Sequence, residues 1–351
     1  SEGLFELAAI GTIGDMAPLV KENRYIVHSG IQELRHTTNI GLRTLMHSAK
    51  IDPPYLTSES IGFSLGPRLN AAGRLDSALK SYQLLMATDS TVAQDLVSDL
   101  EDINQIRREL TNQGLEKSRS MVMNFPNFEN VILVGSQQFN PGILGLVASR
   151  LSAEFGLPAA VYSLESDRVI ASCRSSQKFH WADALALCSD LLDRYGGHAQ
   201  AAGFTCHPSK LEELQGRLIS IANGAISSGK ETPRGEIDAE LPIGSLTNEI
   251  YDQLSVMEPF GIGNQKPIFL AKGILATGIK TMGQLGQHVR MEITQRGAAI
   301  NGVAFNQNWP ARTALADIVY TLDMNRWKGV SELRINILDY QLTDHHPGNS
   351  E

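Results

Sequence analysis

Residues 196–203, Gly-Gly-His-Ala-Gln-Ala-Ala-Gly, combine residue types that suit the binding of a phosphate or a nucleotide. Glycine tolerates positive φ and lets another group approach the main chain closely. The small residues after His198 leave space, and Phe204 resumes an apolar run. The segment therefore predicts a tight turn that presents His198 beside exposed backbone N–H groups, which favour anions. A Gly-rich turn with an incidental surface histidine is the alternative, because short Gly-rich motifs are common.

Ser172 and Arg174 offer further groups that match a phosphate. The strand expected over residues 169–172 ends at Ser172 and runs into Arg174, so we expect both residues at its end, where loops gather ligands. With His198 they supply a hydroxyl, a guanidinium and an imidazole. We therefore predict that the three converge on one phosphate pocket.

Residues 66–75, GPRLNAAGRL, place Arg68, Asn70 and Arg74 among small residues. A guanidinium can bind two phosphate oxygens with parallel hydrogen bonds. The segment therefore indicates a second group of phosphate ligands. The alternative is a loop whose arginines pair with acidic residues of the same domain.

Asp15 follows the apolar run 4–14, which ends in Gly-Thr-Ile-Gly. In α/β proteins an acid after such a run often lies at the mouth of a cleft. A carboxylate there could be a catalytic metal ligand for Mg²⁺ or Mn²⁺, which prefer oxygen. The alternative, favoured by the local pattern, is that Asp15 caps the next helix.

The elements around these residues indicate an α/β protein. Apolar spacings predict one or two helices over residues 23–50 and one long helix over 90–123, about 45 Å at 1.5 Å per residue. Strands and helices then alternate. The strands are expected at 131–135, 158–164 and 169–172, and the helices at 141–155 and 182–192.

From residue 235 onward short alternating segments predict a small β-barrel. They are GEIDAEL, HVRMEI, AINGVAF, DIVYTLDM and LRINILDY, with a helix near 247–257. Such barrels often bind single-stranded nucleic acid through aromatic and basic side chains. The candidates are Arg290, Arg296, Trp309, Arg326, Trp327 and Lys328. The alternative for Trp327 is a core or interface aromatic.

The composition limits the classes of protein to which this chain can belong. The net charge of −8 argues against a broadly basic nucleic-acid surface but allows a local basic groove. The three cysteines have no metal-ligand spacing, which suits a reducing cytoplasm. The sequence contains neither a membrane-length apolar run nor a signal peptide, so we expect a cytoplasmic protein without a membrane partner. The missing initiator Met predicts that the chain starts inside a longer protein.

Four segments together resemble the RecJ single-strand-specific exonucleases of the DHH phosphoesterase superfamily. They are GTIGDMAPL at 11–19, GPRLNAAGRL at 66–75, ASCRSS at 171–176 with GGHAQAAG at 196–203, and PFGIGNQKPIF at 259–269. The resemblance implies a metal-dependent hydrolase that degrades single-stranded DNA from the 5′ end. It also implies five parts in chain order. These are the end of a DHH catalytic domain (1–85), a connecting helix (86–124), a DHH-associated α/β domain (125–228), an oligonucleotide-binding barrel (234–341) and a disordered tail (342–351).

The resemblance assigns roles only to matched positions. Asp15 matches a metal ligand, and the arginine-asparagine segment matches residues near the substrate phosphate. Ser172, Arg174 and His198 match phosphate- and nucleotide-binding residues of the associated domain. The family's earlier metal motifs are expected upstream of Ser1, and Asp344-His345-His346 in the polar tail is interpreted as a coincidence.

Because one carboxylate cannot hold the two Mn²⁺ or Mg²⁺ ions of such a site, we expect this chain alone to bind single-stranded DNA with little or no hydrolysis. A single-strand-binding protein or a helicase is a further expected partner. Two alternatives stay open. One is a non-catalytic module that binds single-stranded nucleic acid or a protein partner. The other is a DHH-family phosphodiesterase for oligonucleotides or cyclic dinucleotides, which the barrel argues against.

Overall fold

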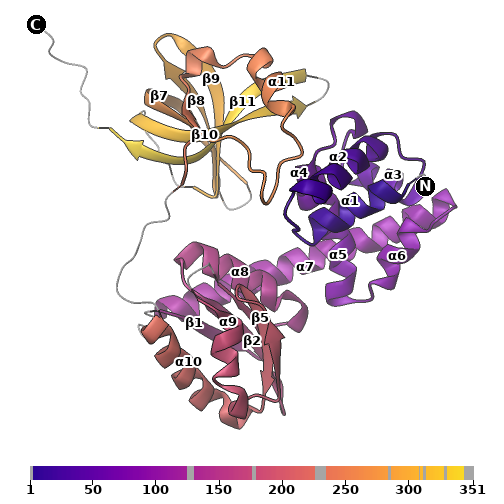
Figure 1. Ribbon diagram of the computed structural model, residues 1–351, viewed down its shortest axis with the longest axis vertical. Coiled ribbons are helices and arrows are strands. Elements are labelled where there is room, and N and C mark those ends of the chain that lie inside the picture. The colour runs from indigo at the N-terminus through magenta and orange to yellow at the C-terminus, as the bar shows by residue number, and fades with distance from the viewer. Residues whose placement is uncertain are drawn as a thin grey trace, which may run out of the picture. The chain divides into compact units, whose positions relative to one another are not determined.

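The computed structural model describes residues 3–124, 130–175, 179–225, 235–283, 286–307, 309–310, 314–327 and 330–343 (Figure 1). The described residues of 1–35, 56–61 and 232–351 form one compact unit, called the barrel unit below. Those of 36–55 and 62–231 form the other, called the sheet unit. The segment 1–35 thus belongs to the same compact unit as the barrel.

The sheet unit contains a mixed sheet whose described strands have the order β1-β2-β3-β5-β4. β1 and β2 are parallel, and the other neighbours are antiparallel. The strand bounds are β1 Ile132–Ser136, β2 Ala159–Leu164, β3 Val169–Arg174, β4 Arg194–Gly197 and β5 Ala201–Cys206. The prediction of strands alternating with helices is confirmed for this region.

Helices cover the two faces of this sheet unequally. One face packs on α8 (Leu144–Phe155), where Val147 and Leu151 are fully buried against β1 and β2. The other face packs on α9 (Trp181–Ala186) and α10 (Leu211–Ala225). Helix α9 is shorter than the helix expected over 182–192, because the 3₁₀ turn η4 (Ser189–Leu191) ends it early.

The described part of the sheet unit also contains the α-helices α3 (Ile40–Ser48), α5 (Gly66–Leu75), α6 (Leu79–Leu85) and α7 (Ser90–Asn124). The long helix expected over 90–123 is confirmed as α7. Helix α3 packs closely on α6, since a Cβ on Gly41 would lie 1.9 Å from the carbonyl oxygen of Leu84. The segment 66–75 is helical, which corrects the alternative of a loop.

The barrel unit begins with α1 (Leu4–Gly14) and α2 (Lys21–Arg35), which pack together closely at Gly30. Two of the segments that carry the family resemblance, 11–19 and 259–269, are in contact in this unit. The Leu19 N–H donates to the Ile262 carbonyl at 2.6 Å, and Gly261 leaves room for the Leu19 side chain. The Ser58 hydroxyl, from the short α4 (Ser58–Ser60), donates to the Phe260 carbonyl at 2.6 Å.

The barrel itself is a closed sheet in which β7, β8, β9, β11 and β10 pair in that order and β10 returns to β7. The bounds are β6 Ala239–Glu240, β7 Phe269–Met282, β8 His288–Gln295, β9 Ala298–Phe305, β10 Ala314–Trp327 and β11 Val330–Leu342, with helix α11 at Asn248–Ser255. The barrel prediction is confirmed, but its first strand was placed wrongly. Residues 235–241 contribute only β6, whereas β7 was not expected.

No helix in the described part of the chain is both long and apolar enough to cross a membrane. Even α7 carries charged residues along its length and buries a mixed stripe that includes Asn104 and Thr111.

Candidate nucleic-acid interface

Strand β3 continues through Arg174, which corrects the expectation that it ends at Ser172. Because alternate residues of a strand point to the same face, both side chains lie on the α8 face of the sheet. A Cβ on Gly145 of α8 would lie 2.8 Å from Arg174 Nη2 and 3.1 Å from Ser172 Oγ. The glycine therefore leaves the space that the guanidinium and the hydroxyl occupy.

Arg174 is held in a defined position. Its Nη1 donates to Ser172 Oγ at 3.1 Å and to the Cys173 carbonyl at 2.8 Å. Burial lowers the pKa of the Arg174 guanidinium, and the positive charge of Arg74 lowers it further. Arg174 forms no ion pair with a carboxylate within the described ranges. The guanidinium is thus positioned and charged, with capacity for an external anion.

His198 lies at the tip of the hairpin between β4 and β5. Its N–H donates to the Ala201 carbonyl at 2.8 Å, and Ala201 in turn pairs with Arg174. Two interstrand steps of about 4.8 Å separate the backbones of Arg174 and His198 by about 10 Å. The His198 side chain is exposed. The strands of the three predicted residues are therefore neighbours, as the pocket requires.

The Gly-Gly pair forms the end of β4 rather than the turn that was expected. Gly197 has a φ of 132°, and the turn begins after it. The tip is fixed to β3, because the Ser175 N–H donates to the Gln200 carbonyl at 3.0 Å. The hairpin is thus anchored at the end that carries His198.

Small residues continue the row of Ser172 across the sheet. Gly203 pairs with Ser172, and Gly196 pairs with Gly203. A Cβ on Gly196 would meet no atom within 4 Å, and all four residues of β4 are exposed. We call Gly196, Ala201 and Gly203 the small-residue shelf. At Gly196, the residue of this row farthest from Ser172, the space is open.

The arginine-asparagine segment divides its side chains between two environments. Arg68 Nε donates to a carboxylate oxygen of Glu101 in α7 at 2.7 Å. The alternative in which an arginine of this segment pairs with an acidic residue of the same domain therefore holds for Arg68. Asn70 and Arg74 are exposed, and they share a different side of α5 because they are one turn apart. The end of α5 lies beside the candidate site, because a Cβ on Gly142, three residues before Gly145, would lie 2.0 Å from the Arg74 carbonyl oxygen.

Asp15 is exposed and ends α1, where its backbone N–H donates to the Gly11 carbonyl at 2.9 Å. It does not cap the next helix, which begins at Lys21. Among the described residues no group of three or more His, Cys, Asp or Glu side chains could hold a metal ion. The described residues around Asp15 therefore do not fit a two-metal site.

The barrel candidates have different outcomes. Arg290 is exposed on β8, directly opposite Lys280 of β7. This like-charge pair was not predicted, because strand β7 was not expected. Trp309 is buried and stacks on Tyr340 with ring centroids 4.1 Å apart, so it is a core residue.

The structure does not describe every candidate. Outside the described residues lie the Trp327 side chain, Lys328 and the Asp344-His345-His346 triplet. Arg296 has a φ of 50° in the turn after β8, and Arg326 lies over the Tyr251 ring.

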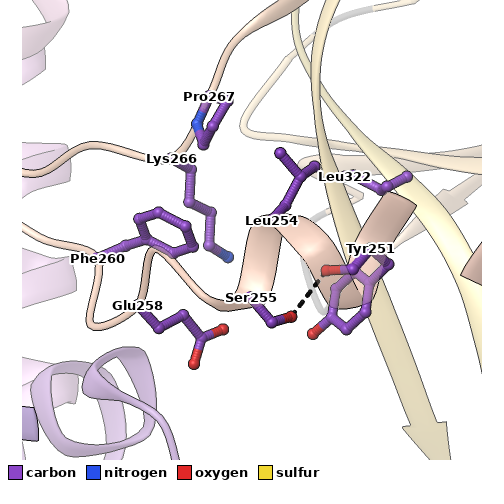
Figure 2. A pocket seen from close by; sticks show the side chains of 8 residues that line it. All are labelled: Tyr251, Leu254, Ser255, Glu258, Phe260, Lys266, Pro267 and Leu322. Atoms are coloured by element: carbon purple, nitrogen blue, oxygen red, sulfur yellow. Dashed lines mark hydrogen bonds between the residues drawn. The ribbon is translucent and has the colours of Figure 1, made fainter. Parts of the chain in front are cut away.

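A small cavity beside the barrel does not fit a nucleotide. It has a volume of about 30 Å³, enough for one or two water molecules. Figure 2 shows Glu258, Lys266 and Ser255 around it, and the Ser255 hydroxyl donates to the Tyr251 carbonyl at 2.9 Å. Burial raises the pKa of Glu258, and the positive charges of Lys266 and Arg35 oppose that rise. The cavity is a structural feature of the barrel unit.

Comparison with protein families assigns two regions of the chain. Residues 129–224 match the DHHA1 domain, and residues 237–339 match the RecJ OB domain. The single-stranded-DNA-specific exonuclease RecJ of Bacillus subtilis is 31% identical over 347 residues, covering 97% of this chain and 44% of the relative. RecJ of Salmonella typhimurium is 30% identical and covers 96% of this chain and 60% of the relative. The chain thus spans about half the length of these relatives.

Solved structures give the same result. RecJ of Thermus thermophilus in complex with Mg²⁺ superposes with a TM-score of 0.83 at 28% identity, covering 97% of this chain and 52% of that one. Its complex with Mn²⁺ superposes with a TM-score of 0.82 at 27% identity, covering 99% and 51%. Both domain types occur in this order, and the chain is similar to the RecJ exonucleases over nearly its whole length.

Proposed function

We propose that this chain forms the nucleic-acid-binding part of an exonuclease that degrades single-stranded DNA from the 5′ end. Arg174, Ser172 and Arg74 would bind the terminal 5′-phosphate over the small-residue shelf. The observation that carries the proposal is the fixed contact of Arg174 with Ser172 at 3.1 Å, in the space that Gly145 leaves and in the same row of the sheet as the open Gly196.

The chemistry of these groups suits a phosphate monoester. A guanidinium donates two parallel hydrogen bonds to phosphate oxygens, and a serine hydroxyl can donate a third. His198 would contribute from the anchored hairpin tip. A terminal phosphate carries more negative charge than an internal diester, so two neighbouring arginines favour the end of a strand over its interior.

The barrel supports a single-stranded ligand. Arg290 and Lys280 face each other on exposed positions of β8 and β7, where like charges are unfavourable without an anion between them. Five-stranded barrels of this type commonly bind single strands. A single-strand-binding protein or a helicase as partner stays a prediction, as does the cytoplasmic location.

The pocket is tested by measuring affinities for the same oligothymidylate with and without a 5′-phosphate. For Arg174→Ala we expect the preference for the phosphorylated strand to fall by about 1.5–3 kcal/mol, roughly 10- to 150-fold, because charged hydrogen bonds are lost. Arg174→Lys should restore only part of it, since lysine keeps the charge without the fork.

Arg168→Ala is the matched control, because Arg168 is exposed near the other end of β3 and pairs with Glu165 at 2.6 Å. An equal loss of affinity for both oligonucleotides in Arg174→Ala would contradict a terminal-phosphate pocket. If Arg168→Ala lowers the preference for the phosphorylated strand as much as Arg174→Ala does, the assignment of the phosphate contact to Arg174 is contradicted.

Hydrolysis by the whole protein is a separate part of the proposal. We propose Mn²⁺ or Mg²⁺ as its cofactor, because the Thermus relative was solved with both ions. With Mn²⁺ present we expect this chain alone to bind single-stranded DNA with little or no cleavage. Robust cleavage that Asp15→Ala abolishes would contradict that expectation and support Asp15 as a catalytic ligand.

A further inference from the structure

Helix α7 buries polar atoms that have no partner within the described part of the chain. Asn104 is 4% exposed, yet its Oδ1 accepts no hydrogen bond. One turn later, the Nε of half-buried Arg107 donates none. Because buried polar groups are nearly always satisfied, two orphans on one side of a helix indicate a place that a ligand or solvent completes.

Two close approaches relate the stripe of α7 that carries Arg107 to the candidate pocket. A Cβ on Gly114, two turns after Arg107, would lie 3.1 Å from Val147 of α8, so this stripe of α7 faces α8. A Cβ on Gly142, in the turn η3 (Pro141–Ile143) before α8, would lie 2.0 Å from the Arg74 carbonyl oxygen. The last turn of α5, the middle of α7 and the start of α8 therefore lie together, next to Gly145 and Arg174.

Arg150 adds a further cation from α8. Its Nη1 donates to Asn112 of α7 at 3.0 Å, which holds the guanidinium against that helix. Burial lowers the pKa of Arg107, and the positive charges of Arg74, Arg108, Arg150 and Arg68 lower it further. Several elements thus direct positive charge toward Arg107.

Three of these cations have no carboxylate partner in the part of the chain that the structure describes. Within the described ranges Arg74, Arg107 and Arg150 form no ion pair with a carboxylate, whereas Arg68 pairs with Glu101. Arg119, on the same helix, pairs with Glu116 and with Glu154 at 2.8 Å. In a chain of net charge −8, an uncompensated cluster of like charge is costly unless an anion occupies it.

We propose that Arg107 and Arg150 bind a second phosphate of the same single strand, an internal diester adjacent to the terminal phosphate at Arg174. The ligand is a nucleic-acid backbone because two fixed guanidiniums recognise phosphate oxygens without reading a base. The Asn104 amide can present its nitrogen to the same anion by a 180° flip, an orientation that hydrogen bonding decides. The identity of the ligand rests on the proposed function, but the site uses different residues.

The experiment titrates 5′-phosphorylated oligothymidylate into the chain at several salt concentrations. Each phosphate neutralised on a single strand contributes about −0.7 to the slope of log affinity against log salt. For Arg107→Gln and for Arg150→Gln we expect a slope shallower by about 0.7, because the phosphate that the two arginines bind together is no longer neutralised. Arg119→Gln removes the same charge from an already neutralised position and should leave the slope unchanged.

Two further readouts separate the possible outcomes. The preference for a 5′-phosphate should persist in both variants, and their thermal midpoints should equal or exceed that of the parent because repulsion is relieved. Arg150→Gln, at an exposed helical position, provides the test if Arg107→Gln does not fold. Unchanged slopes, or slopes that Arg119→Gln changes equally, would overturn this inference alone. A parent chain that binds no oligonucleotide would overturn the proposed function as well.

Discussion

Substitution of Gly145 by alanine separates binding from stability at the candidate pocket. Gly145 lies at the start of α8, and its added Cβ would lie 2.8 Å from Arg174 Nη2 and 3.1 Å from Ser172 Oγ. The nearest atom is the end of a flexible side chain, so the guanidinium can move away. We therefore expect the fold to persist while the contact between Arg174 and Ser172 is lost.

The two effects have opposite signs. Alanine is better than glycine by about 1 kcal/mol in a helix interior, and by less in the first turn, so the free energy of unfolding should stay equal or rise slightly. Displacement of the Arg174 guanidinium should remove part of the roughly 1.5–3 kcal/mol expected for hydrogen bonds to a charged group. Affinity for 5′-phosphorylated oligothymidylate should fall about tenfold, the equivalent of about 1.4 kcal/mol.

Fluorescence anisotropy and thermal unfolding together provide the assay. Gly216→Ala in α10 is the matched control, because its Cβ would meet no atom within 4 Å and only the helix propensity changes. The control should gain stability without a change in affinity. If Gly145→Ala unfolds the chain, or binds the phosphorylated strand as tightly as the parent, the proposed close contact of Arg174 with α8 is refuted.

Three further predictions concern other parts of the chain. Burial raises the pKa of Cys206 to about 11, so the thiol of the folded chain should resist alkylation at pH 8. The free energy of unfolding should fall as the pH rises from about 9 through 11. Rapid labelling of the native chain would contradict this prediction. Burial also raises the pKa of Glu258 from 4.5, so ionisation of the carboxyl lowers the stability of the fold as the pH rises. Glu258→Gln should therefore gain stability relative to the parent as the pH rises from 4 to 7, and urea titrations that show a constant difference would contradict it. Arg290→Ala and Lys280→Ala should each make the salt dependence of single-strand binding shallower by about 0.7 without lowering the thermal midpoint, and unchanged slopes would point to a protein-binding role for the barrel.

Regular periodicity made most of the fold predictable from the sequence. The helix α7 and the strands β2 and β3 were expected within a few residues of their bounds, because their apolar spacing is local. Strand β7 was missed because Gly273 and Gly278 interrupt it at φ values of 63° and 61°. A glycine inside a strand often marks a bulge, and the pairing of β7 with β8 shifts register between Thr277 and Lys280.

The site was predictable only in part, because its contacts join distant segments. The ion pair of Arg68 with Glu101 spans 33 residues, and nothing near Arg68 indicates it. Gly145, a glycine inside a helical pattern, was a signal for close approach, although it was not among the predicted site residues. Arg107 and Arg150 show no shared pattern in sequence, because only the packing of α7 on α8 brings them together.

A crystal structure of this chain with a 5′-phosphorylated oligothymidylate tests the central claim most directly. We expect the terminal phosphate to lie over the small-residue shelf, within hydrogen-bonding distance of the Arg174 Nη atoms and Ser172 Oγ. A strand bound only along the barrel, with its 5′-phosphate in solvent and Arg174 still donating to Ser172, would contradict that claim.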